Sequence, residues 1–221
     1  MATPGVSELN IVLCALDEAP AEMTLLDARE RRRAERLQSE LDRRRFVAAH
    51  TALRRELGQR LDTDPAGLEF SRAPCKVCGA PHGRPIVVPH GGSLARRAGL
   101  HFSLSHSAGQ ALLAFAPTPV GVDIEALPDP AMCERLIALL HPREQARIRS
   151  APREAQQIMF TCLWCRKEAY LKALGVGLTH ESTESYLGSL ESTPGWRVQN
   201  IEAPTGFAGA VATGLVEAVE G

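Results

Sequence analysis

The sequence lacks a long hydrophobic run, and this bears on where the protein works. No apolar stretch in its 221 residues approaches the length of a membrane span, which needs about 20 residues. The first residues, Met1 to Gly5, also lack the basic-then-apolar order of a signal peptide. We therefore expect a cytoplasmic protein that makes no contact with a membrane.

A strong net charge is also missing. The 25 Lys and Arg residues nearly balance the 26 Asp and Glu residues, which leaves a formal charge of −1. Such a balance argues against a protein that coats nucleic acid through bulk charge. Apolar residues make up 44% of the chain, which is enough for a buried core in one large domain or two small ones.

The six cysteines do not indicate a disulfide framework, because thiols stay reduced in the cytoplasm. Two pairs, Cys75 with Cys78 and Cys162 with Cys165, each have the spacing of half a zinc site. The second pair falls inside a predicted helix, where packing alone explains it. A zinc-stabilised interaction domain therefore stays open as an alternative.

Several segments have the periodicity of regular structure. The sequence predicts a buried first strand at 10–16, two helices within 25–61, strands at 100–107 and 111–115, a helical region at 132–149 interrupted before Pro142, and strands at 196–201 and 207–213.

The sequence predicts a helix over residues 152–174, which starts with a proline and ends before Gly175. Trp164, Glu168 and Lys172 then share one stripe at i, i+4 spacing. A solvated ion pair between Glu168 and Lys172 is the simplest explanation of that stripe.

A second acidic group lies upstream, on a predicted strand at 120–125. Strand periodicity places Asp123 and Glu125 on one face and the apolar residues between them on the other. Two neighbouring carboxylates repel each other unless a cation neutralises them, and Mg²⁺ commonly binds one or two carboxylates together with phosphates. Glu168 would supply a third oxygen ligand if the helix packs across the end of this strand.

These two motifs carry a resemblance to a known family. Gly-Val-Asp-Ile-Glu at 121–125 and Trp-Cys-Arg-Lys-Glu-Ala-Tyr-Leu-Lys at 164–172 closely resemble the paired signatures of the 4′-phosphopantetheinyl transferases, of the type that activates surfactin synthetase. The resemblance implies an α+β fold of two similar halves, related by a pseudo-two-fold axis with the ligand cleft between them. The expected halves are residues 1–119 and 120–221.

The resemblance also implies a reaction. These enzymes move the 4′-phosphopantetheine arm of coenzyme A onto a serine of an apo acyl or peptidyl carrier protein and release adenosine 3′,5′-bisphosphate. By resemblance, Asp123, Glu125 and Glu168 would bind Mg²⁺ or Mn²⁺, Glu168 would act as the base, and Lys172 would reach the leaving phosphate. One chain that carries both halves makes a monomer sufficient.

Three further segments resemble the family's nucleotide-binding motifs: an Arg-Phe helix, a Gly-Lys-Pro turn and a Ser-His-Ser strand. The residues that they assign to coenzyme A, together with the lysine, are Arg45, Thr51, Gly83, Arg84, Pro85, Ser105, His106 and Lys172. His50 stands where the family frequently has Arg, and Ser39 and Asp42 stand where the surfactin-type member has phosphate-contacting lysines. The resemblance therefore assigns no residue to the 3′-phosphate from this helix.

Ser105 beside His106 suggests the nucleophile of a serine hydrolase, but strand neighbours point to opposite faces and no Gly-x-Ser-x-Gly elbow surrounds them. A carrier-protein or acyl-coenzyme A binding module that keeps the fold without the chemistry is the main alternative.

Overall fold

The computed structural model describes residues 8–88, 99–176, 186–188 and 192–215. The described part contains two main antiparallel sheets, with orders β1-β5-β4 and β6-β9-β8-β7, and a short β2-β3 hairpin. Their strands are β1 (Asn10–Ala15), β2 (Phe70–Arg72), β3 (Pro85–Val87), β4 (His101–Ser107), β5 (Gln110–Ala116), β6 (Val120–Ala126), β7 (Ser192–Thr193), β8 (Trp196–Ile201) and β9 (Phe207–Gly214).

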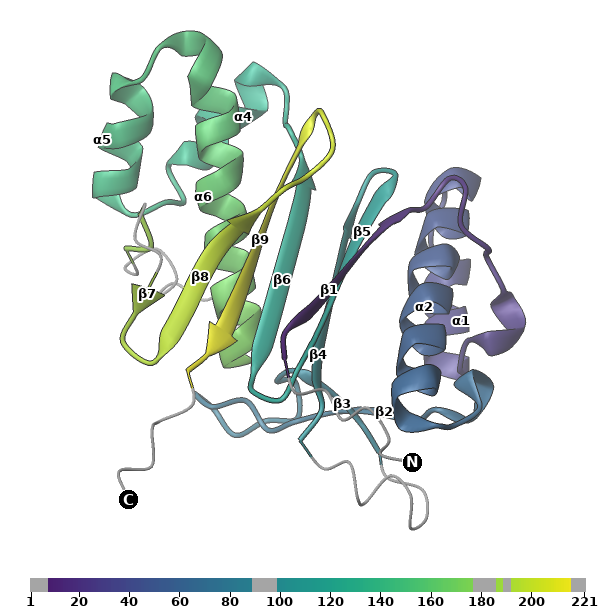
Figure 1. Ribbon diagram of the computed structural model, residues 1–221. Helices are drawn as coiled ribbons and strands as arrows, with labels where there is room; N and C mark the ends of the chain where they lie inside the picture. The colour runs from purple at the N-terminus through teal and green to yellow at the C-terminus, as the bar shows by residue number, and fades with distance from the viewer. Residues whose placement is uncertain (1–7, 89–98, 177–185, 189–191, 216–221) are drawn as a thin grey trace, which may run out of the picture.

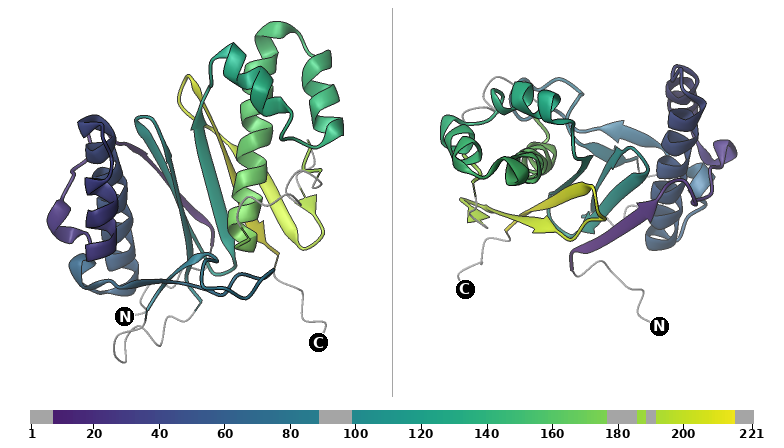
Figure 2. Two further views of the ribbon diagram at one scale, coloured as in Figure 1. Left: turned by 180° about the vertical axis from the view of Figure 1, so that it is seen from behind. Right: turned by 90° about the horizontal axis from the view of Figure 1, so that it is seen from above.

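One long helix covers each main sheet, so that the two sheets lie between them (Figures 1 and 2). Helix α2 packs on β1-β5-β4, and helix α6 packs on β6 and β9. The helices are α1 (Ala28–Glu35), α2 (Glu40–Leu61), α4 (Pro130–Ile137), α5 (Pro142–Ser150) and α6 (Arg153–Leu174), with 3-10 turns at Met23–Leu25 and Pro65–Gly67.

The ends of α6 follow from local sequence. Pro152 is its N-cap residue, and a proline near this position lacks the N–H that would otherwise have no partner. Gly175 ends the helix in the left-handed conformation with φ 78°, and its N–H donates to the carbonyls of Leu171 and Lys172. The predicted helix at 152–174 is confirmed.

Strand β5 is buried on both faces because it separates two cores. On one face, Leu113 and Phe115 pack with Leu53 and Leu57 of α2. On the other face, Leu112 and its neighbours pack against the inner residues of β6 and β9. The two sheets therefore share a core, and apolar burial of this kind is the main stabilising term in folding.

Strands β4 and β6 belong to different sheets, and serine side chains join them where the sheets meet. Ser103 Oγ accepts a hydrogen bond from the Val122 N–H at 3.1 Å, and Ser107 Oγ accepts one from the Ala126 N–H at 3.2 Å. These hydroxyls satisfy backbone groups on the edge of β6 that has no neighbouring strand in its own sheet. The contact places the Ser-His-Ser motif beside the acidic strand.

Most predicted elements are confirmed, but the first strand differs from prediction. We expected it to be buried; instead β1 is an edge strand, and Ile11 and Leu13 are 37% and 42% exposed. Val12 and Cys14, which alternate with them along the strand, face α2. One covered face is enough to hold an edge strand whose outer face meets solvent.

The chain passes from one main sheet to the other between the end of β5 at residue 116 and the start of β6 at residue 120. The predicted α+β class is confirmed. The division into domains at 119/120 and the pseudo-two-fold relation stay predictions. Within the described residues, no helix is long and apolar enough to cross a membrane.

Candidate active site

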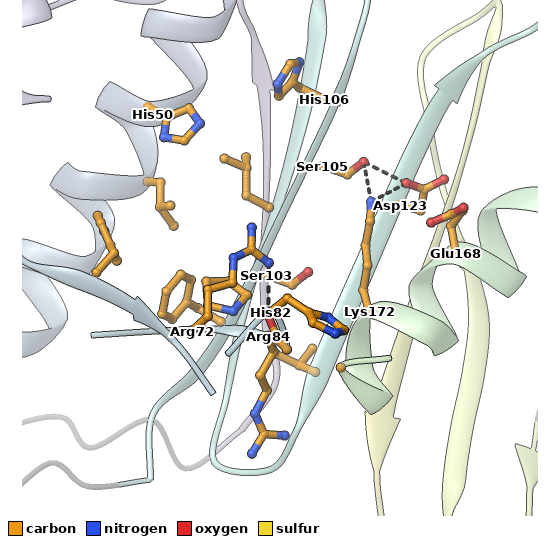
Figure 3. Close-up of a pocket in the computed structure, with 18 of the residues that line it drawn as sticks. His50, Arg72, His82, Arg84, Ser103, Ser105, His106, Asp123, Glu168 and Lys172 are labelled. Atoms are coloured by element: carbon orange, nitrogen blue, oxygen red, sulfur yellow. Dashed lines mark hydrogen bonds and ion pairs between the residues drawn. The ribbon is translucent and has the colours of Figure 1, made fainter. Parts of the chain in front are cut away.

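A cleft of about 780 Å³ lies between helices α1 and α2 on one side and helix α6 on the other, within the size range of small-molecule sites (Figure 3). One wall comes from α1, α2 and β4, and the other comes from β6 and α6. The turn that leads into β3 contributes to its lining. The predicted site residues that line the cleft are Gly83, Arg84, Pro85, Ser105, His106, Asp123, Glu125, Glu168 and Lys172.

Asp123 lies at the centre of the polar contacts. It is 1% exposed, and its Oδ1 accepts hydrogen bonds from Lys172 Nζ at 2.6 Å and from Ser105 Oγ at 2.7 Å. Lys172 Nζ also donates to Ser105 Oγ at 3.0 Å, which closes a triangle across α6, β6 and β4 (Figure 3). The other oxygen, Oδ2, is buried without a hydrogen-bond partner among the described residues. Such an atom is costly to bury unless a cation or donor meets it.

Glu168 lies one turn before Lys172 on α6 and faces the same cleft. Burial, reinforced by the negative charges of Asp123 and Glu125, raises its pKa to about 7 despite the opposing effect of Lys172. The pKa of Glu125 is also raised, chiefly by burial. A divalent cation in this cleft would favour the charged forms of both glutamates, because it offsets the cost of their burial.

The carboxylates do not form a closed metal cage. Among the described residues, the oxygens of Asp123, Glu125 and Glu168 do not all come within 4.8 Å of one another. Mg²⁺ usually retains several waters and takes only one or two carboxylates directly, so a closed cage is not required. The donor set and the unpartnered Oδ2 atom fit such an ion.

The basic side chains near the turn have different directions. Arg72 Nη1 donates to the Gly83 carbonyl at 3.0 Å, and its guanidinium points into the cleft (Figure 3). The side chain of Arg84 runs the other way, away from Asp123. Its Nε and Nη1 are buried without acceptors among the described residues, and burial lowers its pKa.

Two predicted coenzyme A contacts lie outside the cleft lining. Arg45 forms a two-bond ion pair with Asp17, at 2.7 and 2.8 Å. Thr51 is 1% exposed, and its hydroxyl accepts the Glu22 N–H at 3.0 Å. Neither residue therefore joins the nine predicted site residues that line the cleft.

The helix residues that depart from the family pattern have structural partners. Ser39 caps α2 by accepting the Asp42 N–H at 3.2 Å. His50 lines the cleft and meets Glu30 Oε1 through its Nδ1 at 2.7 Å. A phosphate contact from Ser39 or Asp42 has no support in this geometry.

Several residues that line the cleft were not predicted from the sequence: Arg29, Arg33, Arg72 and His82. Nothing local distinguishes these arginines among the 25 basic residues of the chain. His82 did have a signal, because it follows Cys78 at a spacing that suits a shared metal site.

Comparison with known proteins agrees with this geometry. Residues 119–205 match the family model of the 4′-phosphopantetheinyl transferase superfamily. The chain is 32% identical to the 4′-phosphopantetheinyl transferase HetI of Nostoc sp. over 93% of this chain and 87% of HetI. It is 30% identical to a phosphopantetheinyl transferase of Thraustochytrium sp. over 69% of this chain and 54% of that protein.

A more distant match is the 4′-phosphopantetheinyl transferase Sfp of Bacillus subtilis, with 23% identity over 71% of this chain and 63% of Sfp. The extent of the HetI match, together with the family model over the half that carries Asp123 and Glu168, decides the family. The chain belongs to the 4′-phosphopantetheinyl transferase superfamily, whose enzymes transfer phosphopantetheine from coenzyme A to carrier proteins.

Proposed function

We propose that this enzyme transfers the 4′-phosphopantetheine arm of coenzyme A to a serine of an apo acyl or peptidyl carrier protein, releases adenosine 3′,5′-bisphosphate, and requires Mg²⁺. The observation that carries the proposal is the convergence of Asp123, Glu168 and Lys172 in one cleft. The reaction needs a group to accept the serine proton and a positive charge for the phosphates, and these residues provide both.

Asp123, Glu125 and Glu168 are the proposed ligands of Mg²⁺, or of Mn²⁺ in its place. The unpartnered Oδ2 of Asp123 and the raised pKa values of both glutamates support this assignment. A bound Mg²⁺ would neutralise part of the diphosphate charge of coenzyme A.

Glu168 is the proposed general base for the carrier serine. A pKa of about 7 leaves a substantial ionised fraction at neutral pH and still allows the carboxylate to hold a proton once it has accepted one. Its position in the cleft, close enough to Asp123 for mutual repulsion, supports this role.

Lys172 is the proposed partner of the leaving phosphate. Its Nζ is already held by Asp123 Oδ1 and Ser105 Oγ, which restricts the side chain to the floor of the cleft. A fixed ammonium group can stabilise the charge that grows on the departing oxygen without first having to reorganise.

The nucleotide end of coenzyme A is proposed to lie along Gly83, Arg84, Pro85, Ser105 and His106. Arg72 joins this set, because its guanidinium points into the cleft. Arg45 and Thr51 are left out, since each has a partner elsewhere. Both cleft walls come from one chain, so a monomer is sufficient for the reaction.

The test is to incubate the protein with coenzyme A, Mg²⁺ and a panel of apo carrier proteins of fatty-acid, polyketide and nonribosomal-peptide type. Mass spectrometry of each carrier should show addition of the phosphopantetheinyl group, and chromatography should show adenosine 3′,5′-bisphosphate. Glu168→Gln should reduce turnover by about 100-fold or more, as loss of a general base typically does. Tight binding of coenzyme A with no released bisphosphate on any carrier would instead indicate a non-catalytic binding module.

A further inference from the structure

A second cluster of ligand-type side chains lies at the tip of the β2-β3 hairpin. The ligand atoms of Cys75, Cys78 and His82 all lie within 4.8 Å of one another, and Cys78 Sγ is 3.0 Å from His82 Nε2. His82 also lines the cleft, next in the chain to the Gly83 to Pro85 turn (Figure 3). The proposed reaction does not use these three side chains.

The arrangement is close to the geometry of zinc. With Zn–S of about 2.3 Å and Zn–N of about 2.0 Å, a tetrahedral site separates sulfur from nitrogen by about 3.5 Å and two sulfurs by about 3.8 Å. The present distances reach these values with shifts on the order of 1 Å. Two thiolates and an imidazole form a soft donor set, which favours Zn²⁺ over the Mg²⁺ expected at the carboxylates.

The backbone around Cys75 supports a bound thiolate. The N–H groups of Val77 and Cys78 donate to Cys75 Sγ, while the N–H of Gly79 donates to the Cys75 carbonyl at 2.8 Å. Gly79 has φ 73°, so the chain turns tightly about this sulfur. Hydrogen bonds of this kind orient metal ligands and tune their basicity.

The hairpin tip gains little stability from apolar burial. Cys75 is buried, but Val77 is 61% exposed, and Lys76, Cys78 and His82 are exposed as well. A segment with so little apolar burial gains most from a cross-link that ties its two sides together.

The turn that follows the cluster is packed tightly. Gly83 donates its N–H to the Ala73 carbonyl at 2.9 Å, and a Cβ on Gly83 would lie only 2.6 Å from that oxygen. On its other side, the Arg84 backbone nitrogen lies 3.2 Å from where a Cβ of Gly175 would be, at the end of α6. The turn is therefore packed between the start of the hairpin tip and the end of α6.

We propose that Cys75, Cys78 and His82 bind one Zn²⁺ ion, which holds the hairpin tip in the shape that presents Gly83 to Pro85 to coenzyme A. Water completes the four-coordinate set when these three are the protein ligands. The binding of zinc itself is independent of the proposed function, whereas its effect on coenzyme A rests on it.

The other C-x-x-C pair provides the contrast. Cys165 is fully buried between α6 and β9 and donates to the Ala208 carbonyl at 3.3 Å. Among the described residues, no third ligand joins Cys162 and Cys165 in a metal-binding group. Packing explains this pair, and Cys162→Ser is therefore the matched control.

The first experiment measures metal content of tag-free protein, purified without chelator, by inductively coupled plasma mass spectrometry. Wild type and Cys162→Ser should each contain about one zinc per chain, while Cys78→Ser and His82→Gln should lose at least about 90% of it. Residues 78 and 82 are exposed, so circular dichroism should show both variants folded. Equal zinc in wild type and Cys78→Ser, or loss in Cys162→Ser alone, would overturn the assignment.

The second experiment replaces zinc by Co²⁺ and records the absorption spectrum. Intense absorption bands of four-coordinate cobalt, with sulfur-to-metal charge transfer, should appear in wild type and be absent in Cys78→Ser.

The third experiment measures the kinetics of metal-free protein. Zinc removal by a chelator should raise KM for coenzyme A severalfold with little change in kcat, and added zinc should restore KM. An unchanged KM in metal-free protein would overturn the role in presenting the turn. An inactive protein that still binds zinc would count against the proposed function and leave the metal site standing.

Discussion

Gly121 on β6 lies directly against the backbone of Ala169 on α6. A Cβ atom on Gly121 would be 2.1 Å from the Ala169 carbonyl oxygen and 2.5 Å from the Ala173 amide nitrogen. The missing side chain therefore sets how closely the helix approaches the strand. Because Asp123 follows on the same face of the strand and Glu168 precedes Ala169 on the helix, this contact also sets the spacing of the two acids.

Gly121→Ala should consequently damage both stability and activity. Inserting a methyl group into a packed contact typically costs about 1–3 kcal/mol, and a shift of the α6 backbone would separate Asp123 from Glu168. Calorimetry should show a Tm lowered by about 2–4 °C for each kcal/mol, together with a reduced kcat. Gly67→Ala is the control, since its Cβ would meet only Asp64 Cβ at 3.9 Å. An unchanged Tm and kcat in Gly121→Ala would contradict this role.

Glu168→Gln should change how stability depends on pH in metal-free buffer. The pKa of Glu168 is raised from its ordinary 4.5 to about 7, chiefly by burial, so between these values the folded state holds a proton that the unfolded state has released. The folded state then binds more protons, and the stability contributed by this group falls as pH rises from 4.5 to 7. Glutamine does not titrate, so the variant does not lose this contribution. Urea unfolding should show that the free energy of unfolding of the variant rises relative to that of wild type between pH 4.5 and 7. Parallel plots of this free energy against pH would contradict the raised pKa.

Mg²⁺ should raise the Tm of the metal-free protein, because a ligand that binds only the folded state stabilises it. At 100 times its Kd the gain is about 2.7 kcal/mol. Asp123→Asn should remove most of this gain, since Asp123 carries the unpartnered Oδ2. Glu134→Gln, at an exposed position on α4, should retain it. A full response to Mg²⁺ in Asp123→Asn would place the ion elsewhere.

Local signals in the sequence were sufficient for α6 and for the alternation on β6. The left-handed glycine at 175 and the two-residue period of Asp123 and Glu125 depend only on near neighbours. The meeting of Asp123 with Glu168 is a tertiary contact, and it was expected from the resemblance of two motifs rather than from either alone.

The features that the sequence did not reveal have the opposite origin, because they depend on partners distant in sequence. Arg45 has the expected motif but pairs with Asp17, which lies 28 residues earlier. The exposed face of β1 depends on its edge position beside β5, which its own apolar residues do not specify. Arg72 became a candidate only once its direction in the cleft was visible.

Glu144 should be a strong determinant of stability outside the cleft. It is 0% exposed, pairs with Lys167 Nζ at 3.2 Å, and accepts the N–H groups of Leu187 and Gly188 at 2.9 and 3.1 Å. Glu144→Ala should lower the free energy of unfolding by about 3–5 kcal/mol, as expected when one member of a buried pair is removed. Chemical denaturation is the measurement. Glu40→Ala, which breaks the exposed pair with Arg43, should cost no more than about 1 kcal/mol, and equal losses would contradict the role of burial.

Arg72→Ala should weaken coenzyme A binding more than it affects the chemical step. Its guanidinium points into the cleft while one nitrogen holds the Gly83 carbonyl, so the side chain can contact a phosphate and orient the turn at once. A charge-assisted hydrogen bond contributes about 1.5–3 kcal/mol, so KM for coenzyme A should rise about tenfold or more with kcat largely kept. Arg72→Lys should recover only part of the loss, because lysine lacks the forked donors of arginine. Arg31→Ala, on the basic helix α1 and outside the cleft lining, should leave KM unchanged. If Arg31→Ala and Arg72→Ala raised KM equally, the effect would come from the general positive charge of this surface rather than from the direction of one side chain.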